Sequence, residues 1–400
     1  MKKRILFVDD EEFVLRGLDR LLRPMREEWD MEFVNSGDAA LTRMGEAPFN
    51  VVISDMRMPG MNGAELLNEV MKRHPKTVRI ILSGYADREL ILRCVGSTHQ
   101  YLAKPCDAKT LQMTLQRAMQ LEHSLRNDTL RQLVTRCTEL PSVPALYSKI
   151  IEALQDPSVD VEFIGEMVMK DVGITAKILK LANSAFFGLG HEIASPSEAI
   201  AYLGTDTVKS LILFTNTFSP AAPINIEGFS LETLWNHSLE VANASKAVAF
   251  AEGADRKLGD EAYVAGLLHD VGLLIFATNL GTEYQQVLKL MHEKKKPVAE
   301  CEKQVFGATH ADVGGYLLGL WGLPVPVVEA IALHHQPGET LLKSFSPLTA
   351  VHIGNAMVSA ELPAIAGAPA VAIDTHYLAS IGVKPNLKVW REAWKENRRH

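Results

Sequence analysis

The stretch RILFVDD (residues 4–10) places four consecutive apolar residues directly before two aspartates. Four similar runs follow: MEFVNS (31–36), NVVISDM (50–56), VRIILSG (78–84) and QYLAKP (100–105). Each run precedes a segment with helical periodicity. Apolar strands that alternate with helices are typical of a parallel sheet covered by helices on both faces. We therefore predict an α/β domain with a five-stranded parallel sheet over residues 1–122.

Polar side chains stand where these predicted strands end. Asp9 and Asp10 follow the first strand, Asp55 ends the third, Ser83 ends the fourth and Lys104 follows the fifth. The carboxyl ends of the strands in an open parallel sheet form the binding crevice. Three carboxylates there would repel one another unless a hard cation such as Mg²⁺ lay among them. A lysine and a hydroxyl opposite them could hold the oxygens of a phosphoryl group.

The first 122 residues resemble a response-regulator receiver domain. The motifs FVDDEE (7–12), SDMRMPGMNG (54–63), LSGYAD (82–87) and YLAKP (101–105) match that family in order and spacing. The resemblance implies a flavodoxin-like fold that is phosphorylated by a histidine kinase. It makes Asp55 the phosphoacceptor. It also implies that Mg²⁺ is held by Asp9, Asp10, Asp55 and the main chain at Arg57, and that the phosphoryl contacts and the aromatic switch are Ser83, Lys104 and Tyr101.

The segment that follows the predicted sheet contains no Pro or Gly from residue 107 to residue 137. One helical stripe carries Leu111, Leu115, Ala118 and Leu125. This pattern predicts that the last receiver helix continues as a stiff helical connector over residues 123–137. The heptad pattern of a dimeric coiled coil is weak after Leu125, and a homodimer remains an alternative to a monomer.

Residues 138–360 show helical periodicity nearly throughout, which predicts an all-α domain. Its informative feature is the placement of five histidines and one acid. They are His237, His269, Asp270, His310, His334 and His335. Imidazoles and carboxylates from successive helices of a bundle build metal sites, here for Fe, Mn or Zn. Asp270 could instead accept hydrogen bonds from its imidazole neighbours in a purely structural cluster.

These residues resemble the HD superfamily of metal-dependent phosphohydrolases, in which His237, His269 and Asp270 would fill three ligand positions. Asn355 stands near the place of a later acidic ligand, and a neutral amide there weakens the affinity for a divalent metal. The HD-GYP relatives, which hydrolyse cyclic di-GMP, continue from the paired histidines into an acid and a Gly-Tyr-Pro turn. Here HHQPGET (334–340) follows instead.

The second domain resembles HDOD domains more closely. The characteristic stretches occur in order: LPSVPALYSKIIEAL (140–154), DVGITAKILKLANSAFFG (171–188), SEAIAYLG (197–204), LWNHSLEVA (234–242), AGLLHDVG (265–272), GATHADVGGYLLGLWGLP (307–324) and AIALHH (330–335). The resemblance implies a signalling output module related to the HD superfamily without general catalytic activity. A metal site in this domain would then be vestigial.

The charge distribution bears on the class of partner. Residues 123–383 carry 17 basic and 28 acidic side chains, a net charge of −11. Such an acidic body is a poor match for nucleic acid, so we expect no nucleic-acid partner. Residues 361–400 form a C-terminal extension that ends in a predicted basic helix with Trp390 and Trp394. Because no uncharged apolar run reaches membrane-spanning length, we expect a cytoplasmic protein without a membrane partner.

The sequence leads to two hypotheses about function. The first is a two-component response regulator that a histidine kinase phosphorylates on Asp55. Its helical output domain would bind a further, unidentified signalling protein without catalysis. The alternative is a metal-dependent HD-type phosphodiesterase that acts on cyclic di-GMP or another nucleotide. A transcriptional activator is disfavoured because the helical domain shows no basic stripe.

Overall fold

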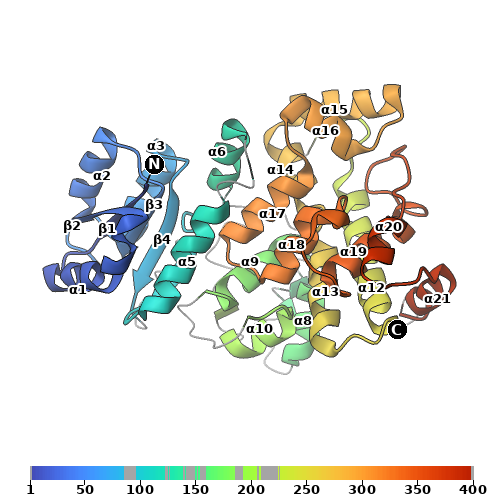
Figure 1. Ribbon diagram of the computed structural model, residues 1–400, viewed down its shortest axis with the longest axis horizontal. Coiled ribbons are helices and arrows are strands. Elements are labelled where there is room, and N and C mark those ends of the chain that lie inside the picture. Colours follow the sequence, from blue (N-terminus) through green and yellow to red (C-terminus); the bar gives the residue numbers. More distant parts are fainter. Residues whose placement is uncertain are drawn as a thin grey trace.

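The computed structural model shows an α/β domain followed by a helical domain (Figure 1). The described residues are 2–84, 96–121, 127–137, 159–184, 192–204 and 226–397, together with residues 125, 140, 149–150, 152–153, 207–208 and 224. The tail of the LSGYAD motif and most of the expected helices over 145–154 and 206–214 lie outside these residues. The predicted two-part fold class is confirmed.

The first domain contains a five-stranded parallel sheet in the order β2-β1-β3-β4-β5. The strands are β1 (Lys3–Val8), β2 (Trp29–Val34), β3 (Val51–Asp55), β4 (Val78–Ser83) and β5 (Gln100–Ala103). Each predicted strand is present, and the central strands β3 and β4 are buried throughout. They are buried because helices cover both faces of the sheet, which is why their apolar runs are continuous rather than alternating.

The described helices of this domain are α1 (Glu12–Leu22), α2 (Gly37–Glu46), α3 (Gly63–Arg73) and α5 (Ala108–Leu121), with a 3-10 turn η1 (Arg23–Glu27). A capping box starts α3, because Asn62 and Glu65 each accept a hydrogen bond from the other's main-chain N–H. Gly63 brings this helix close to the end of β3. A Cβ atom on Gly63 would lie 2.1 Å from the main-chain oxygen of Asp55.

The connector differs from the predicted continuous helix. The last receiver helix, α5, is described as far as Leu121, residues 125 and 127 are not helical, and a new helix α6 (Asp128–Arg136) begins after Asn127. The Asn127 side chain accepts hydrogen bonds from the N–H groups of Thr129 and Leu130. The prediction was wrong here because an asparagine inside a helical pattern can serve as an N-cap. The stripe itself is buried, as expected.

The described residues of the second domain fold into helices and connecting segments, which confirms the all-α prediction. The helices are α8 (Val161–Val168), α9 (Val172–Ala182), α10 (Pro196–Leu203), α12 (Leu231–Ala251), α13 (Arg256–Leu268), α14 (Val271–Asn279), α15 (Gly281–Lys294), α16 (Val298–Phe306), α17 (His310–Leu320), α18 (Val325–Leu333), α19 (Pro347–Ser359), α20 (Thr375–Ser380) and α21 (Leu387–Asn397). A short 3-10 turn η4 (Pro337–Glu339) follows α18.

Glycines let the central helices approach closely. A Cβ atom on Gly266 of α13 would lie 2.9 Å from the Cα of Ala242 on α12. A Cβ atom on Gly354 of α19 would lie 2.7 Å from the Ser245 hydroxyl of the same α12. Both helices therefore pack directly on the α12 backbone, which fixes the histidines that they and α12 carry relative to one another.

One stretch of the described residues, Arg256–Asn279, is long and apolar enough to cross a membrane, but 94% of its apolar window is buried inside the protein. The C-terminal helix α21 docks on α12 through two fully buried tryptophans. Trp390 Nε1 donates to Glu252 and Trp394 Nε1 donates to Glu240. The expected terminal helix is present up to Asn397, and residues 398–400 lie outside the described chain.

Candidate phosphorylation and metal sites

The strand ends of the first domain bring two carboxylates and one lysine together. Lys104 Nζ lies 2.6 Å from Asp9 Oδ2 and also forms an ion pair with Asp55 Oδ1. Asp9 and Asp55 are buried. Burial raises the pKa of Asp55, and the positive charge of Lys104 offsets only part of this effect. The lysine therefore holds two adjacent carboxylates that would otherwise repel each other.

The remaining receiver residues surround this ion pair at different depths. The main-chain N–H of Arg57 donates to Asp55 Oδ2 at 2.6 Å, and Asp10 is exposed at the mouth of the site. Ser83 is fully buried at the end of β4, and Tyr101 is fully buried in β5. Oxygen donors of this kind fit a hard cation such as Mg²⁺, which Asp9, Asp10 and Asp55 could bind.

The second domain gathers several of its histidines around one carboxylate, Asp270. We call the group of His237, His269, Asp270, His310, His334 and His335 the His–Asp cluster. His237 comes from α12, His269 and Asp270 from the junction of α13 and α14, His310 from the start of α17, and the other two from the end of α18. Asp270 is almost fully buried. The sequence pattern therefore identified residues that the fold brings into one place.

Four imidazole Nε2 atoms surround the Asp270 carboxylate. Those of His269 and His237 lie 3.3 and 3.7 Å from Oδ2. Those of His310 and His334 lie 3.3 and 3.9 Å from Oδ1. Burial by itself would raise the pKa of Asp270, but the surrounding imidazoles hold it well below its usual value. Asp270 is therefore a carboxylate in this site.

Main-chain carbonyl groups fix the tautomer of three of these rings. Nδ1 of His237 donates to the Leu362 carbonyl at 2.6 Å. His269 and His334 donate in the same way to carbonyls one turn earlier in their own helices, at 2.7 and 2.8 Å. Burial lowers the pKa values of His237 and His334, so these two rings are neutral and present their Nε2 lone pairs toward Asp270.

Two of the Nε2 atoms around Asp270 have no hydrogen-bond partner. His269 Nε2 and His334 Nε2 are buried and unpaired among the described residues. Buried polar atoms are normally hydrogen-bonded, and a ring nitrogen without such a partner is available as a metal ligand. A cation beside Asp270 would be coordinated by these nitrogens. The hydrogen-bonded structural cluster that the sequence left open therefore accounts for only part of the geometry.

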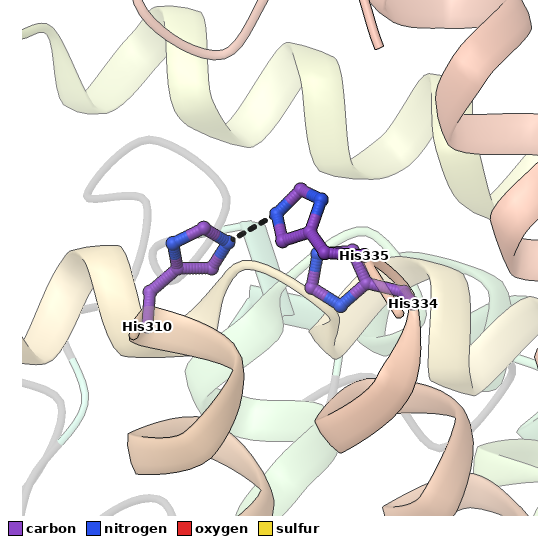
Figure 2. A group of neighbouring side chains, drawn as sticks. All are labelled: His310, His334 and His335. Carbon is purple, nitrogen blue, oxygen red and sulfur yellow. Dashed lines mark hydrogen bonds between the residues drawn. The ribbon is translucent and has the colours of Figure 1, made fainter. Parts of the chain in front are cut away.

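A second group of rings lies on the other side of Asp270. Figure 2 shows the His310 and His335 rings pointing toward each other, with 2.9 Å between their Nε2 atoms. His310 Nδ1 donates to Glu302 Oε2 at 2.6 Å, and its main-chain N–H donates to the same oxygen. Although burial opposes it, the charges of Glu302 and Asp270 raise the pKa of His310 to about 10. Burial and the adjacent His310 lower the pKa of His335 to about 3.

Glu302 is the functional residue that the sequence analysis missed. It is fully buried on α16 and also accepts a hydrogen bond from the Tyr284 hydroxyl. One signal was available, because Glu302 precedes the buried Phe306 by one helical turn and so lies on the inward face of its helix. An acid on that face needs a partner, and His310 is the partner.

Asn355 lies at the edge of the cluster. It is buried on α19, contacts His237, and accepts a hydrogen bond from the Ser359 hydroxyl at 2.7 Å. His352, on the same helix, is turned away: its Nδ1 donates to the His334 carbonyl and its Nε2 accepts from the Asp374 main chain. Only the neutral amide therefore reaches the cluster from α19.

The donor geometry fits metal ions in two separate groups. The first is His237, His269 and Asp270, and the second is His310, His334 and His335, and the ligand atoms within each group lie within 4.8 Å of one another. The cluster borders a cavity of about 420 Å³ that also touches Lys303, Thr309 and Asn355. A small ligand could therefore reach Asp270, His310 and His335.

Comparisons with known proteins divide the chain in the same way as the structure. Residues 5–116 match the response regulator receiver domain, and residues 140–337 match the HDOD domain. The hydrogenase transcriptional regulatory protein HoxA of Cupriavidus necator is 38% identical over 120 residues, which are 30% of this chain and 24% of HoxA. The chain spans between 24% and 39% of the length of the first curated relatives that it matches.

Solved structures resemble the two parts of the chain. The signal receiver domain of an HD domain-containing protein from Pseudomonas fluorescens Pf-5 is 32% identical, with a TM-score of 0.30, and covers 31% of this chain and all of that one. The MmoQ response regulator of Methylococcus capsulatus is 22% identical, with a TM-score of 0.49, and covers 64% of this chain and 98% of that one. The two family matches place the chain among the response regulators that join an N-terminal receiver domain to an HDOD domain.

Proposed function

We propose that a histidine kinase phosphorylates this response regulator on Asp55, and that the HDOD domain passes the signal on by binding another signalling protein. The observation that supports this most is the buried Asp55 carboxylate held beside Asp9 by Lys104. The cytoplasm is the expected compartment, and the downstream partner is unidentified. HoxA is named a transcriptional regulator, but the aligned 120 residues cover only a quarter of it. That name does not change our expectation of no nucleic-acid partner.

The residues of the receiver site have separate roles in this proposal. The Asp55 carboxylate attacks the phosphorus of a phosphohistidine in line with the leaving imidazole. Mg²⁺, held by Asp9, Asp10, Asp55 and the main chain at Arg57, would offset the developing negative charge. Lys104 leaves its ion pairs to contact a phosphoryl oxygen, and Ser83 supplies a hydroxyl. Tyr101 then changes its side-chain position as Ser83 and Lys104 move toward the phosphoryl group.

Phosphotransfer tests this proposal directly. The protein is incubated with Mg²⁺ and labelled acetyl phosphate, a small phosphodonor, and the acyl phosphate formed is counted. We expect about one phosphoryl group per chain in the wild type and none in Asp55→Asn. Asp107→Asn is the matched control, because Asp107 is an exposed carboxylate that only caps α5. Equal labelling of Asp55→Asn and the wild type would show that the phosphoacceptor is wrong.

We also infer that the His–Asp cluster binds a divalent metal such as Fe, Mn or Zn. The observation that favours this is the pair of unpartnered Nε2 atoms on His269 and His334. A bound metal would supply a Lewis acid and a hydroxide nucleophile for phosphodiester hydrolysis. Hydrolysis of cyclic di-GMP or another nucleotide is the alternative function. The neutral Asn355 disfavours this hydrolysis, so the non-catalytic signalling role is our preferred proposal.

Metal analysis separates these readings. Protein is purified without chelator or affinity-tag metal, and its metal content is compared with that of His269→Ala and Asp270→Ala. His376→Ala is the control, because His376 is exposed on α20, away from the cluster. Near-stoichiometric metal that is lost only in the cluster variants supports the metal site, and hydrolysis of cyclic di-GMP is then assayed. A metal-free wild type that stays metal-free after incubation with Mn²⁺ or Zn²⁺ contradicts it.

A further inference from the structure

The C-terminal end of α17, a helix of the HDOD domain, accepts a hydrogen bond from the receiver domain. The last carbonyl groups of a helix have no partner within the helix. Here Gln100 Nε2 of β5 donates to the Leu320 carbonyl at 3.1 Å. Arg117 of α5 donates to the Leu323 carbonyl just beyond the helix. The turn after α17 bonds the carbonyls of Leu317, Leu318 and Gly319, and the receiver domain completes the cap at Leu320. The receiver arginine also lies at the negative end of the helix dipole.

A buried lysine of the HDOD domain donates a hydrogen bond to the receiver domain. Lys180 of α9 is 2% exposed, and its Nζ donates to the Thr98 carbonyl of the receiver domain at 2.6 Å. The same ammonium group lies 4.7 Å from the centre of the Trp321 ring, at the end of α17. Arg79 of β4 donates to the preceding carbonyl, that of Ser97, at 2.6 Å. The turn before β5 is therefore fixed by one cation from each domain.

The opposite end of α17 belongs to the His–Asp cluster. His310 is the first residue of the helix and the one that pairs with Asp270, Glu302 and His335. The helix has 11 residues, which corresponds to roughly 16 Å between the cluster and the receiver contact. One helix thus connects the candidate metal site to the domain that carries Asp55.

The packing leaves α17 little room to bend. A Cβ atom on Gly272 would lie 2.0 Å from the His310 carbonyl oxygen. Cβ atoms on Gly314 and Gly315 would lie 2.9 Å from Val271 and 2.8 Å from Ala332, respectively. The neighbouring helices α14 and α18 each adjoin cluster residues. A shift at the cluster would therefore move the helix as a unit rather than be absorbed within it.

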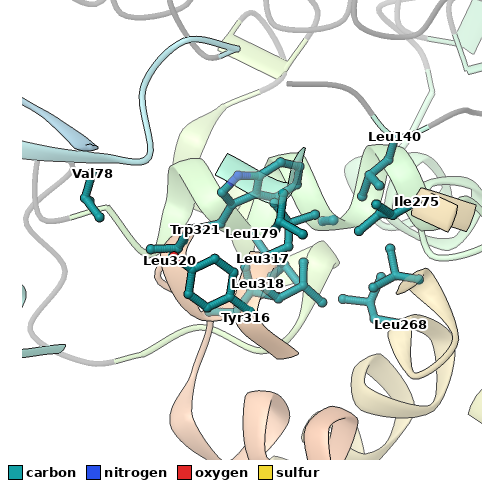
Figure 3. Close-up of a cluster of buried hydrophobic side chains, with 14 of the residues drawn as sticks. Val78, Leu140, Leu179, Leu268, Ile275, Tyr316, Leu317, Leu318, Leu320 and Trp321 are labelled. Atoms are coloured by element: carbon teal, nitrogen blue, oxygen red, sulfur yellow. The ribbon is translucent and has the colours of Figure 1, made fainter. Parts of the chain in front are cut away.

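The far half of α17 is embedded in an apolar cluster that includes the receiver domain. Figure 3 shows Tyr316, Leu317, Leu318, Leu320 and Trp321 of this segment, with Leu179 of α9 beside them and Val78 of β4 facing Leu320 and Trp321. All of these side chains are buried. The packed contact and the hydrogen bonds therefore act on the same end of the helix.

We infer that α17 couples the two sites, so that metal binding at the His–Asp cluster and the state of the receiver domain influence each other. This inference rests on the proposed metal site. Coordination of a metal by His310 and His334 would change the position of the start of α17 relative to the end of α18. The rigid helix would carry this change to Leu320 and Leu323, where Gln100 and Arg117 hold the receiver. By reciprocity, a receiver state that metal binding favours would raise the metal affinity by the same factor by which the metal favours that state.

The first test measures Mn²⁺ binding by calorimetry in excess Mg²⁺, which occupies the receiver site. Lys180→Met removes the Thr98 hydrogen bond and the Trp321 contact while keeping the side-chain volume. Lys76→Met is the matched control, because Lys76 forms an exposed ion pair with Asp128 and does not touch α17. We expect Lys180→Met to change the Mn²⁺ affinity at least about fivefold and Lys76→Met to leave it unchanged. Equal affinities in all three proteins would overturn the coupling.

The second test does not require a bound metal. Asp270→Asn changes the charge of the cluster without changing its size. We expect hydrogen exchange of the amides over residues 318–323 and 97–101 to differ from that of the wild type in this variant. If the wild type binds no Mn²⁺, only the proposed metal site is refuted. The hydrogen exchange of Asp270→Asn then decides whether α17 couples the cluster to the receiver domain. A folded Asp270→Asn protein with unchanged exchange at both segments would show that α17 transmits nothing.

Discussion

His310 and Glu302 form a buried ion pair, with 2.6 Å between imidazole Nδ1 and carboxylate Oε2 and neither side chain exposed to solvent. The same carboxylate oxygen accepts the main-chain N–H of His310, so Glu302 fixes both the start of α17 and the charge of its first residue. Asp270 lies on the other side of the ring, 3.3 Å from Nε2. The positively charged His310 therefore lies between the carboxylates of Glu302 and Asp270, and a metal bound at Asp270 would compete with it.

Replacing Glu302 tests the strength of this arrangement. We expect Glu302→Gln to lower the free energy of unfolding by about 1.5–3 kcal/mol, because it removes a charged acceptor from two buried N–H groups. Urea unfolding measures the change. Glu300→Gln is the control, since the Glu300 side chain is 56% exposed on the same helix and should change stability little. Equal stability of the two variants would contradict a structural role for the pair.

Lys104 should have a stabilising role that Mg²⁺ can replace. We expect Lys104→Met to lower the free energy of unfolding by about 1–3 kcal/mol without Mg²⁺, because Asp9 and Asp55 then face each other unpaired. Added Mg²⁺ should restore most of this loss, since the cation binds the same carboxylates. Lys72→Met, which removes an exposed ion pair to Glu69, serves as the control. A Mg²⁺ effect of the same size in both variants would contradict this prediction.

His334 should behave differently with and without metal. In chelator we expect His334→Leu to unfold within about 1 kcal/mol of the wild type, because Nε2 of the lost ring has no hydrogen-bond partner. Mn²⁺ at a hundred times its dissociation constant should stabilise the wild type by about 2.7 kcal/mol and the variant much less. Thermal unfolding with and without Mn²⁺ measures both effects. Equal stabilisation of the two proteins would place the metal elsewhere.

His99 should make the receiver contact sensitive to acid. Burial, together with the charges of Arg79 and Lys180, holds the pKa of His99 well below its usual value, and its Nδ1 accepts the Arg79 main-chain N–H at 3.0 Å. The unfolded chain therefore binds a proton that the folded protein excludes, and stability falls as the pH drops below about 6.5. Relative to His99→Gln, the wild type should lose up to about 1.4 kcal/mol per pH unit there.

Urea unfolding between about pH 7.5 and 5.5 measures this difference, and His376→Gln controls for the loss of an exposed histidine. The comparison of variants matters because other buried histidines, such as His334, also have lowered pKa values. A pH dependence that is the same in the wild type and His99→Gln would show that His99 contributes nothing to it.

The C-terminal helix should contribute to the stability of the helical domain. We expect Trp394→Ala to lower the free energy of unfolding by about 3–5 kcal/mol, because it leaves a cavity against α12 and removes the donor to Glu240. Thermal unfolding and proteolysis of the C-terminal segment measure this loss. Val389→Ala in the same helix is the control, because Val389 is 41% exposed. Similar effects of both substitutions would mean that α21 is not docked through Trp394.

The sequence by itself determined the fold class and predicted the residues of both candidate sites except Glu302. Apolar strands that end in Asp9, Asp55 and Ser83 required a parallel sheet, because only a sheet covered on both faces buries such continuous runs. The histidines similarly fell on successive predicted helices, which indicated a common interior site. These features are local, and local periodicity records which face of each element is buried.

Only the tertiary structure decided how these residues are used. The ion pair between Glu302 and His310 and the bond from Gln100 to the Leu320 carbonyl each depend on a partner elsewhere in the chain. The last of these joins residues 220 positions apart. The sequence also did not determine the orientation of the imidazole rings, because hydrogen bonds to main-chain carbonyls fix which ring nitrogen carries the proton. Sequence patterns encode burial, but they do not encode the long-range contacts that satisfy buried polar groups.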